Sequence, residues 1–173
     1  MDLTPKEWYE LGYEMGEVEN SIVRLMFTLQ SKYGKSNKYT KLLFSLYNRP
    51  LCGLKSNLDD LVCSAYPNSV HTLPNYENIN LTSVFYHINR CSGEEYNSFG
   101  RRIRPLPKSL SSNEMIDLSA SIQSIGIYIS KVNKLFFNSK NKHVNTIEKA
   151  LTELSDFYKS MIKDSSDNKS KNQ

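Results

Sequence analysis

The sequence has no long apolar run and few cysteines. No stretch approaches the roughly 20 apolar residues that a membrane-spanning helix needs. The three cysteines, Cys52, Cys63 and Cys91, form an odd number without a close pair. On one helix, Cys52 and Cys63 would lie roughly 16 Å apart, beyond disulfide reach. Since the first residues also lack a signal-peptide pattern, we expect a cytoplasmic protein in a reducing compartment, with no membrane contact.

Familiar catalytic and metal-binding patterns are also missing. The chain has no P-loop, no Gly-x-Ser-x-Gly nucleophile motif and no dinucleotide-binding glycine fingerprint. Its histidines, His71, His87 and His143, have no cysteine or second histidine at zinc-ligand spacing. No Glu-x-x-His occurs that would suggest a di-iron site. We therefore expect no metal and no cofactor, and we favour a non-enzymatic role.

What the sequence does contain is apolar residues recurring at alternating steps of three and four. The pattern runs from Trp8 to Leu29 and from Met115 to Phe136, with shorter versions over 51–65 and 144–161. This spacing places one apolar stripe on each of several long helices, which leave water only by packing against one another. The sequence therefore predicts an all-α fold, an antiparallel bundle of four main helices.

Capping residues indicate where these helices begin and end. Thr4 and Glu7 form a capping box before the first helix, and Gly34 is suited to end it after about residue 33. Ser111 and Glu114 form a second capping box, which opens a helix running to about residue 137. The second helix should begin near residue 36 or 37, and the last should extend from about 143 to 161 or 162.

Proline and asparagine mark the interruptions. Pro50 must kink or divide the second helix, because proline lacks a backbone donor. Residues 67–110 should form an irregular connector with one short extra helix near 81–88. We therefore predict a single helical-bundle domain over 1–162, built from two αα-hairpins joined by the connector. The remainder, 163–173, has no large apolar residue and is expected to be a disordered polar tail.

The connector carries the densest charge in the chain, at Arg101, Arg102, Arg104 and Lys108. Arginine forks suit phosphates or carboxylates, so these four residues are a candidate binding surface. Equally, they could pair within the protein with Glu7, Glu10 and Glu14 on the first helix. The sequence leaves both alternatives open.

A second basic cluster depends on the expected topology. If the four helices simply alternate in direction, the turns at 33–38 and 138–143 lie at the same end of the bundle. Lys35, Lys38, Lys140 and Lys142 would then form one basic pole, which could follow a nucleic-acid backbone or an acidic protein surface. Lysines are also favoured at helix C-termini by the helix dipole, so this cluster has a purely structural alternative.

The function favoured by these observations is binding of another protein, as an adaptor, inhibitor or regulator. Eleven tyrosines, several of them off the apolar stripe, suit a protein interface. The alternative is a nucleic-acid-binding protein that uses the basic poles. A third hypothesis is a degenerate helical-bundle nuclease or nucleotide pyrophosphohydrolase, since Glu-x-x-Glu pairs such as Glu14 and Glu17 recur in the magnesium-binding pyrophosphohydrolases. Homo-oligomerisation stays open.

Overall fold

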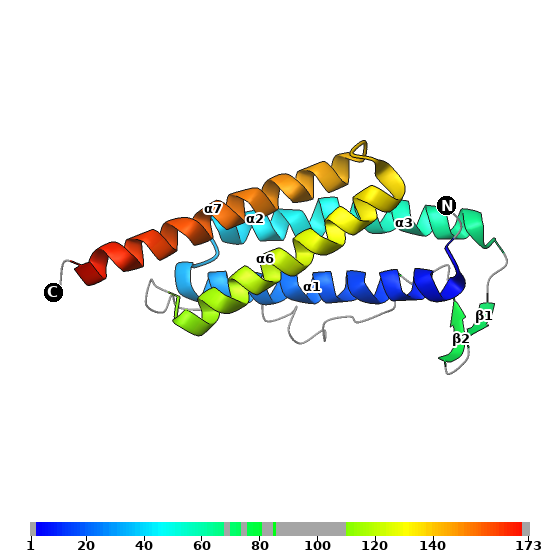
Figure 1. Cartoon of the computed structure of the whole chain (residues 1–173), viewed down its shortest axis with the longest axis horizontal. Coiled ribbons are helices and arrows are strands. Elements are labelled where there is room, and N and C mark those ends of the chain that lie inside the picture. The colour runs from blue at the N-terminus through cyan, green and yellow to red at the C-terminus, as the bar shows by residue number, and fades with distance from the viewer. Residues whose placement is uncertain (1–2, 68–69, 74–75, 81–84, 86–109, 171–173) are drawn as a thin grey trace.

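The computed structural model describes residues 3–67, 70–73, 76–80, 85 and 110–170. Within these residues the chain forms a bundle of long helices with one small β-hairpin at its side (Figure 1). The helices are α1 (Pro5–Tyr33), α2 (Lys38–Leu46), α3 (Cys52–Ala65), α6 (Ser112–Val132) and α7 (Lys142–Ser170). The predicted all-α bundle class is confirmed. None of the described helices combines the length and apolar character needed to cross a membrane.

Helix α1 begins and ends where its caps predict. The Thr4 N–H donates to the Glu7 carboxylate at 2.7 Å, and the Glu7 N–H donates back to the Thr4 hydroxyl at 3.3 Å. At the other end Gly34 has φ 82° and donates its N–H to the Gln30 carbonyl at 2.9 Å. Glycine adopts a positive φ without strain because it has no Cβ atom, which explains why the helix stops there.

Pro50 lies in a π-helical turn, Tyr47–Leu51, between α2 and α3. Asn37 caps α2 by accepting from the N–H groups of Tyr39 and Thr40, at 2.8 and 3.4 Å. Proline cannot donate a backbone hydrogen bond, and the wider turn carries the helix past that gap. The predicted interruption is therefore a local change of helical geometry, with Pro50 itself buried.

The second hairpin, formed by α6 and α7, is also predicted correctly at its start and at its turn. The Ser111–Glu114 capping box opens α6, and a π-helical turn, Asn133–Phe137, extends it to the expected end. Asn138 and Ser139 take φ of 46° and 64°, a left-handed turn that reverses the chain. Asn141 then caps α7 by accepting from the His143 N–H at 2.8 Å.

Two predictions about irregular segments are wrong. Helix α7 continues to Ser170, so most of the expected disordered tail 163–173 is helical. Extending an existing helix is easier than nucleating one, and 163–170 contains no proline or glycine to stop it. In the predicted connector, β1 (Val70–Leu73) pairs antiparallel with β2 (Tyr76–Asn80), with Val70 opposite Asn80. The proline and asparagine density indicated a turn there and hid the short strands beside it.

The rest of the predicted connector is described at Phe85 and Leu110. Phe85 is helical and buried, and its ring meets Trp8 edge-on, with centroids 6.2 Å apart. The other residues of the predicted short helix, and residues 86–109, lie outside the described part. Phe85 therefore attaches the chain near the beginning of α1.

The predicted bundle, in which successive helices alternate in direction, differs from the structure at one point. Each hairpin is antiparallel as predicted, but α6 begins beside the end of α1, where Glu114 pairs with Lys32 at 3.1 Å (Figure 1). The turns at 33–38 and 138–141 therefore lie at opposite ends of the bundle, and the predicted shared pole is wrong. Only short connections force neighbouring helices into alternation. The 24 residues of 86–109 can reach roughly 80 Å, while α1 is about 43 Å long.

The core lies between the predicted stripes. All seven stripe residues of α1 from Trp8 to Leu29 are buried, and α6 contributes Leu118, Ile125, Ile129 and Val132. One ion pair crosses this interior, from the Lys55 ammonium on α3 to the Glu19 carboxylate on α1 at 2.8 Å. Removing Lys55 would leave the Glu19 carboxylate without this partner in a largely buried position.

Candidate functional site

A groove of about 420 Å³ runs between α1 and α6. Its walls come from both helices: Tyr13, Glu14, Glu17, Val18 and Ser21 of α1, and Ser124, Ile127, Tyr128 and Lys131 of α6. Ser21 and Ser124 have small side chains, which leave space where larger residues would close the contact. The groove is therefore built into the pairing of the two helices.

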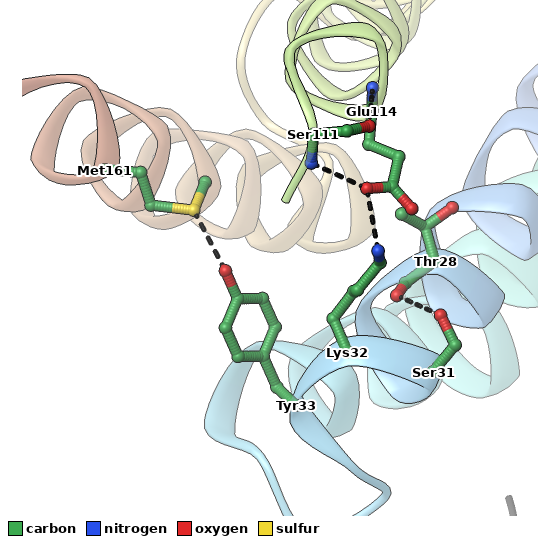
Figure 2. A network of polar contacts seen from close by, with 7 residues as sticks. All are labelled: Thr28, Ser31, Lys32, Tyr33, Ser111, Glu114 and Met161. Carbon is green, nitrogen blue, oxygen red and sulfur yellow. Dashed lines mark hydrogen bonds and ion pairs between the residues drawn. The ribbon is translucent and has the colours of Figure 1, made fainter. Parts of the chain in front are cut away.

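Two ion pairs fix α1 against α6, one in the wall of the groove and one beyond it. The Lys131 ammonium contacts both carboxylate oxygens of Glu14 at 2.8 Å. Near the other end of the helix pair, Lys32 reaches the Glu114 carboxylate, the same group that completes the α6 capping box (Figure 2). The hydrogen bond from the Ser111 N–H, together with Lys32, lowers the pKa of Glu114 below its usual value. Both pairs follow an antiparallel register.

Helix α7 also contacts α1 near the Lys32–Glu114 ion pair, where α1 ends and α6 begins. The Tyr33 hydroxyl, at the end of α1, donates to the Met161 sulfur at 3.4 Å (Figure 2). Burial raises the pKa of Tyr33, so its hydroxyl keeps its proton near neutral pH. Helices α1, α6 and α7 therefore meet at the end of α1 through neutral or ion-paired groups. These contacts stabilise the fold.

Tyr128 forms the polar floor of the groove. Its hydroxyl donates to the Leu11 carbonyl at 3.1 Å and is buried. Burial, followed by the nearby Glu14 and Glu19 carboxylates, raises the pKa of Tyr128 well above its usual value. The phenol therefore stays protonated and holds the two helices together, which does not suit it to act as a base.

The outward face of α6 beside the groove carries two exposed isoleucines. Ile116 and Ile127 are each 63% exposed, and Tyr13 across the groove is 48% exposed. Ile116 and Ile127 are eleven residues apart, which is close to three whole helical turns, so they lie on the same side of α6. No charged residue occurs from 118 to 130, although this stretch includes exposed positions. We call Ile116, Ala120, Gln123 and Ile127 the outer α6 face.

The α1 side of the groove is acidic. Four glutamates, Glu7, Glu10, Glu14 and Glu17, follow one another along the first half of α1. Lys6, which contacts Glu10 at 3.7 Å, and Lys131 offset part of this charge. Of these four, Glu14 and Glu17 line the groove, so acidic groups lie beside the Ile127 end of the outer α6 face.

The connector residues Arg101, Arg102, Arg104 and Lys108 lie outside the described part of the chain. Their proposed internal partners are engaged elsewhere: the Glu7 carboxylate with the Thr4 cap, and that of Glu14 with Lys131. The hydrogen bond from the Thr4 N–H lowers the pKa of Glu7. Both alternatives for the arginine cluster therefore stay predictions.

The second basic cluster is divided. Lys35 and Lys38 lie at the turn where α1 ends, and Lys140 and Lys142 lie at the opposite end, where α7 begins (Figure 1). Lys38 contacts the Glu153 carboxylate at 3.3 Å. The structure does not bring the four lysines together into one surface.

The described residues contain no group of three histidine, cysteine, aspartate or glutamate side chains that could hold a metal ion. Cys52 and Cys63 are free thiols. His143 packs its ring against Gly53, and burial lowers its pKa. These groups therefore occupy separate structural positions.

Sequence reasoning did not find the groove, although one signal was present. The uncharged stretch 118–130 can be read from the sequence, but periodicity drew attention only to its core stripe.

Comparison with family models, with curated proteins and with solved structures gave no match to this chain. Any assignment of function therefore depends on the site itself.

Proposed function

We propose that this protein binds another protein, as an adaptor, inhibitor or regulator, and that the groove and the outer α6 face receive an amphipathic helix of the partner. The observation that carries the proposal is the exposure of Ile116 and Ile127 on a helix without charge from 118 to 130. Exposed helix faces usually carry charged residues, whereas the centres of protein interfaces are depleted of them.

The dimensions suit a helix as the occupant. Ile116 and Ile127 are roughly 16 Å apart along α6, which corresponds to three helical turns of a partner. Tyr13 and Ile127 lie on opposite walls of the groove, so an apolar side chain between them would contact both helices. Helix-in-groove recognition uses such anchors at successive turns.

Charge determines which kind of helix fits. Glu14 and Glu17 lie in the α1 wall of the groove, so the Ile127 end of the outer α6 face has acidic neighbours. A partner with basic residues beside its apolar stripe would place them against these carboxylates, which favours correct orientation and fast association. An acidic amphipathic helix would meet repulsion at the same edge.

Binding is a better description of the groove than catalysis. Its strongest polar groups satisfy one another, since Lys131 holds Glu14 and the Tyr128 hydroxyl holds the Leu11 carbonyl. A hydrolytic site needs polar groups that converge on a substrate. The nucleic-acid hypothesis gains no support from the divided lysine cluster.

The test uses a fluorescein-labelled helical peptide of about 18 residues with a leucine stripe flanked by lysines, followed by fluorescence anisotropy. A peptide with glutamate in place of lysine and a scrambled lysine peptide are the controls. The protein variant Ile116→Ser/Ile127→Ser removes the exposed apolar side chains. Its matched control, Leu61→Ser/Ile162→Ser, removes two exposed apolar residues from α3 and α7.

We expect saturable binding of the lysine peptide, about tenfold weaker binding by Ile116→Ser/Ile127→Ser, and no change in the control variant; tenfold corresponds to about 1.4 kcal/mol. Equal affinity of all variants, or preference for the glutamate peptide, would refute the proposal. A concentration-dependent dimer that the isoleucine variant abolishes would assign the face to a second copy of the chain and also overturn it.

A further inference from the structure

Two short side chains face each other inside the groove between α1 and α6. The two ion pairs that join these helices span residues 14–32 of α1 and 114–131 of α6, nearly equal lengths of helix. One antiparallel register therefore holds between the two pairs, and it places Ser21 of α1 opposite Ser124 of α6. Both serines line the groove. A gap remains at their level because neither side chain is long enough to fill it.

Exposed apolar groups border this gap, whereas two of its polar groups are already engaged within the protein. Tyr13 and Ile127 lie on opposite walls and are both exposed. The Lys131 ammonium is held by the Glu14 carboxylate, and the Tyr128 hydroxyl donates to a backbone carbonyl of α1. An apolar side chain that enters the gap would cover the exposed groups without displacing either of these contacts.

The position and size of the gap suit one side chain of a helix lying on the outer α6 face. Ser124 lies between Ile116 and Ile127 in the sequence of α6, so a helix that covers both isoleucines passes over it. With a volume of about 420 Å³, the groove has room for a side chain as large as leucine or phenylalanine. Packed helices commonly insert a side chain of one helix into such a space between residues of its neighbours.

We propose that the gap between Ser21 and Ser124 receives one large apolar side chain, leucine or phenylalanine, from the partner helix, and that the two serines set the size of this anchor. The inference rests on the proposed function, because the same partner helix supplies the anchor. An interface residue buried in a pocket usually contributes more affinity than residues on an open face. The anchor should therefore dominate binding.

The experiment repeats the anisotropy titration with the lysine peptide and with a series of peptides in which each stripe leucine in turn is replaced by alanine. The series on the native chain needs no protein variant. Ser124→Leu then fills the gap from α6, and Ser21→Leu fills it from α1. Ser56→Leu is the matched control, because it makes the same change at an exposed position of α3. Circular dichroism checks that each variant is folded.

We expect one leucine of the peptide to cost the native chain at least about tenfold in affinity when it becomes alanine, and the others less than about threefold. Ser124→Leu and Ser21→Leu should each weaken binding of the parent peptide about tenfold, with Ser56→Leu unchanged. In Ser124→Leu the alanine peptide that lacks the anchor should bind about as well as the parent peptide, because the anchor no longer enters the gap.

The outcomes separate this inference from the proposed function. Failure of the lysine peptide to bind the native chain would overturn both. Binding that is weakened by Ile116→Ser/Ile127→Ser but not by Ser21→Leu or Ser124→Leu would overturn only the anchor. Equal small losses along the alanine series, or an equal loss in Ser56→Leu, would also overturn the anchor and leave the helix-binding face in place.

Discussion

Helices α6 and α7 form one hairpin, yet they contact the rest of the bundle in opposite ways. Helix α7 approaches α3 so closely that the His143 ring lies against Gly53, where a Cβ atom would overlap it. Helix α6 approaches α1 but leaves a groove of about 420 Å³. The α3–α7 approach is close at this one point, whereas the longer α1–α6 interface leaves a groove along part of its length.

The outward faces of α6 and α7 also differ, in the kind of residue that they expose. Helix α7 exposes charged residues along its length, among them Lys142, Glu148, Lys149, Asp156 and Lys159. Helix α6 exposes Ile116 and Ile127 and has no charge from 118 to 130. Both helices are held by buried inward stripes, so folding does not require this difference. The comparison indicates that the outer α6 face serves binding.

The largest expected effect is a difference in unfolding free energy between variants on the buried face and on the exposed face of α6. Ile125 is fully buried and Ile127 is 63% exposed, two residues apart on the same helix. Ile125→Ala should lower the free energy of unfolding by about 2–5 kcal/mol, because it leaves a cavity in the core. Ile127→Ala should change it by less than about 0.5 kcal/mol. Urea denaturation followed by circular dichroism measures both, and similar losses would show that the two faces do not differ.

The tight α3–α7 contact predicts a smaller loss. In Gly53→Ala the new methyl group displaces the His143 imidazole, the end of a partly exposed side chain, and we expect this displacement to cost about 1 kcal/mol in the free energy of unfolding. The added helix propensity of alanine offsets less than about 1 kcal/mol of this. Thermal and urea denaturation provide the measurement.

A double-mutant cycle isolates that contact. Removing the ring in His143→Ala should make room for the methyl group that Gly53→Ala introduces. The double variant Gly53→Ala/His143→Ala should therefore be more stable than the sum of the single changes predicts. Additive losses in the cycle would mean that the imidazole and Gly53 do not constrain the approach of α7.

Asp59 on α3 predicts a pH effect on the same side of the bundle. Burial raises its pKa from 3.8 to about 6, against the opposing effects of Lys55 and of a hydrogen bond from the Phe85 backbone. The folded state therefore binds the Asp59 proton more tightly than the unfolded state does. Its favourable contribution is present below about pH 4 and is lost as the pH rises through 6.

Asp59→Asn should remove this component of the pH dependence. Because Asp59 is partly exposed, we expect a gain of no more than about 1 kcal/mol in unfolding free energy at pH 7 relative to the native chain. Urea denaturation at several values between pH 4 and pH 7 gives the two curves. Parallel curves for the native protein and the variant would show that Asp59 does not titrate in this range.

The helices could be predicted from the sequence because their signals are local. The capping pairs Thr4 with Glu7 and Ser111 with Glu114 formed as expected, and Gly34 ended α1. The apolar spacing identified the buried stripe of α1 without error. Such signals depend on neighbours within one or two helical turns, which the sequence displays directly.

The direction of α6 and the location of a site could not be obtained in this way. The orientation of α6 relative to α1 depends on a long connection, for which local sequence sets no preference between the two ends. Periodicity identified the α6 stripe that includes Ile125, but it gave no sign that Ile116 and Ile127 form a second, outward apolar face.

The central claim, that the outer α6 face is dispensable for folding and required for binding, is tested most directly by one variant measured twice. Ile116→Ser/Ile127→Ser is unfolded in urea and titrated with the lysine peptide under the same buffer conditions. We predict an unfolding free energy within about 0.5 kcal/mol of the native chain and a peptide affinity about tenfold weaker. A loss of more than about 2 kcal/mol in stability, with unchanged peptide affinity, would contradict the account.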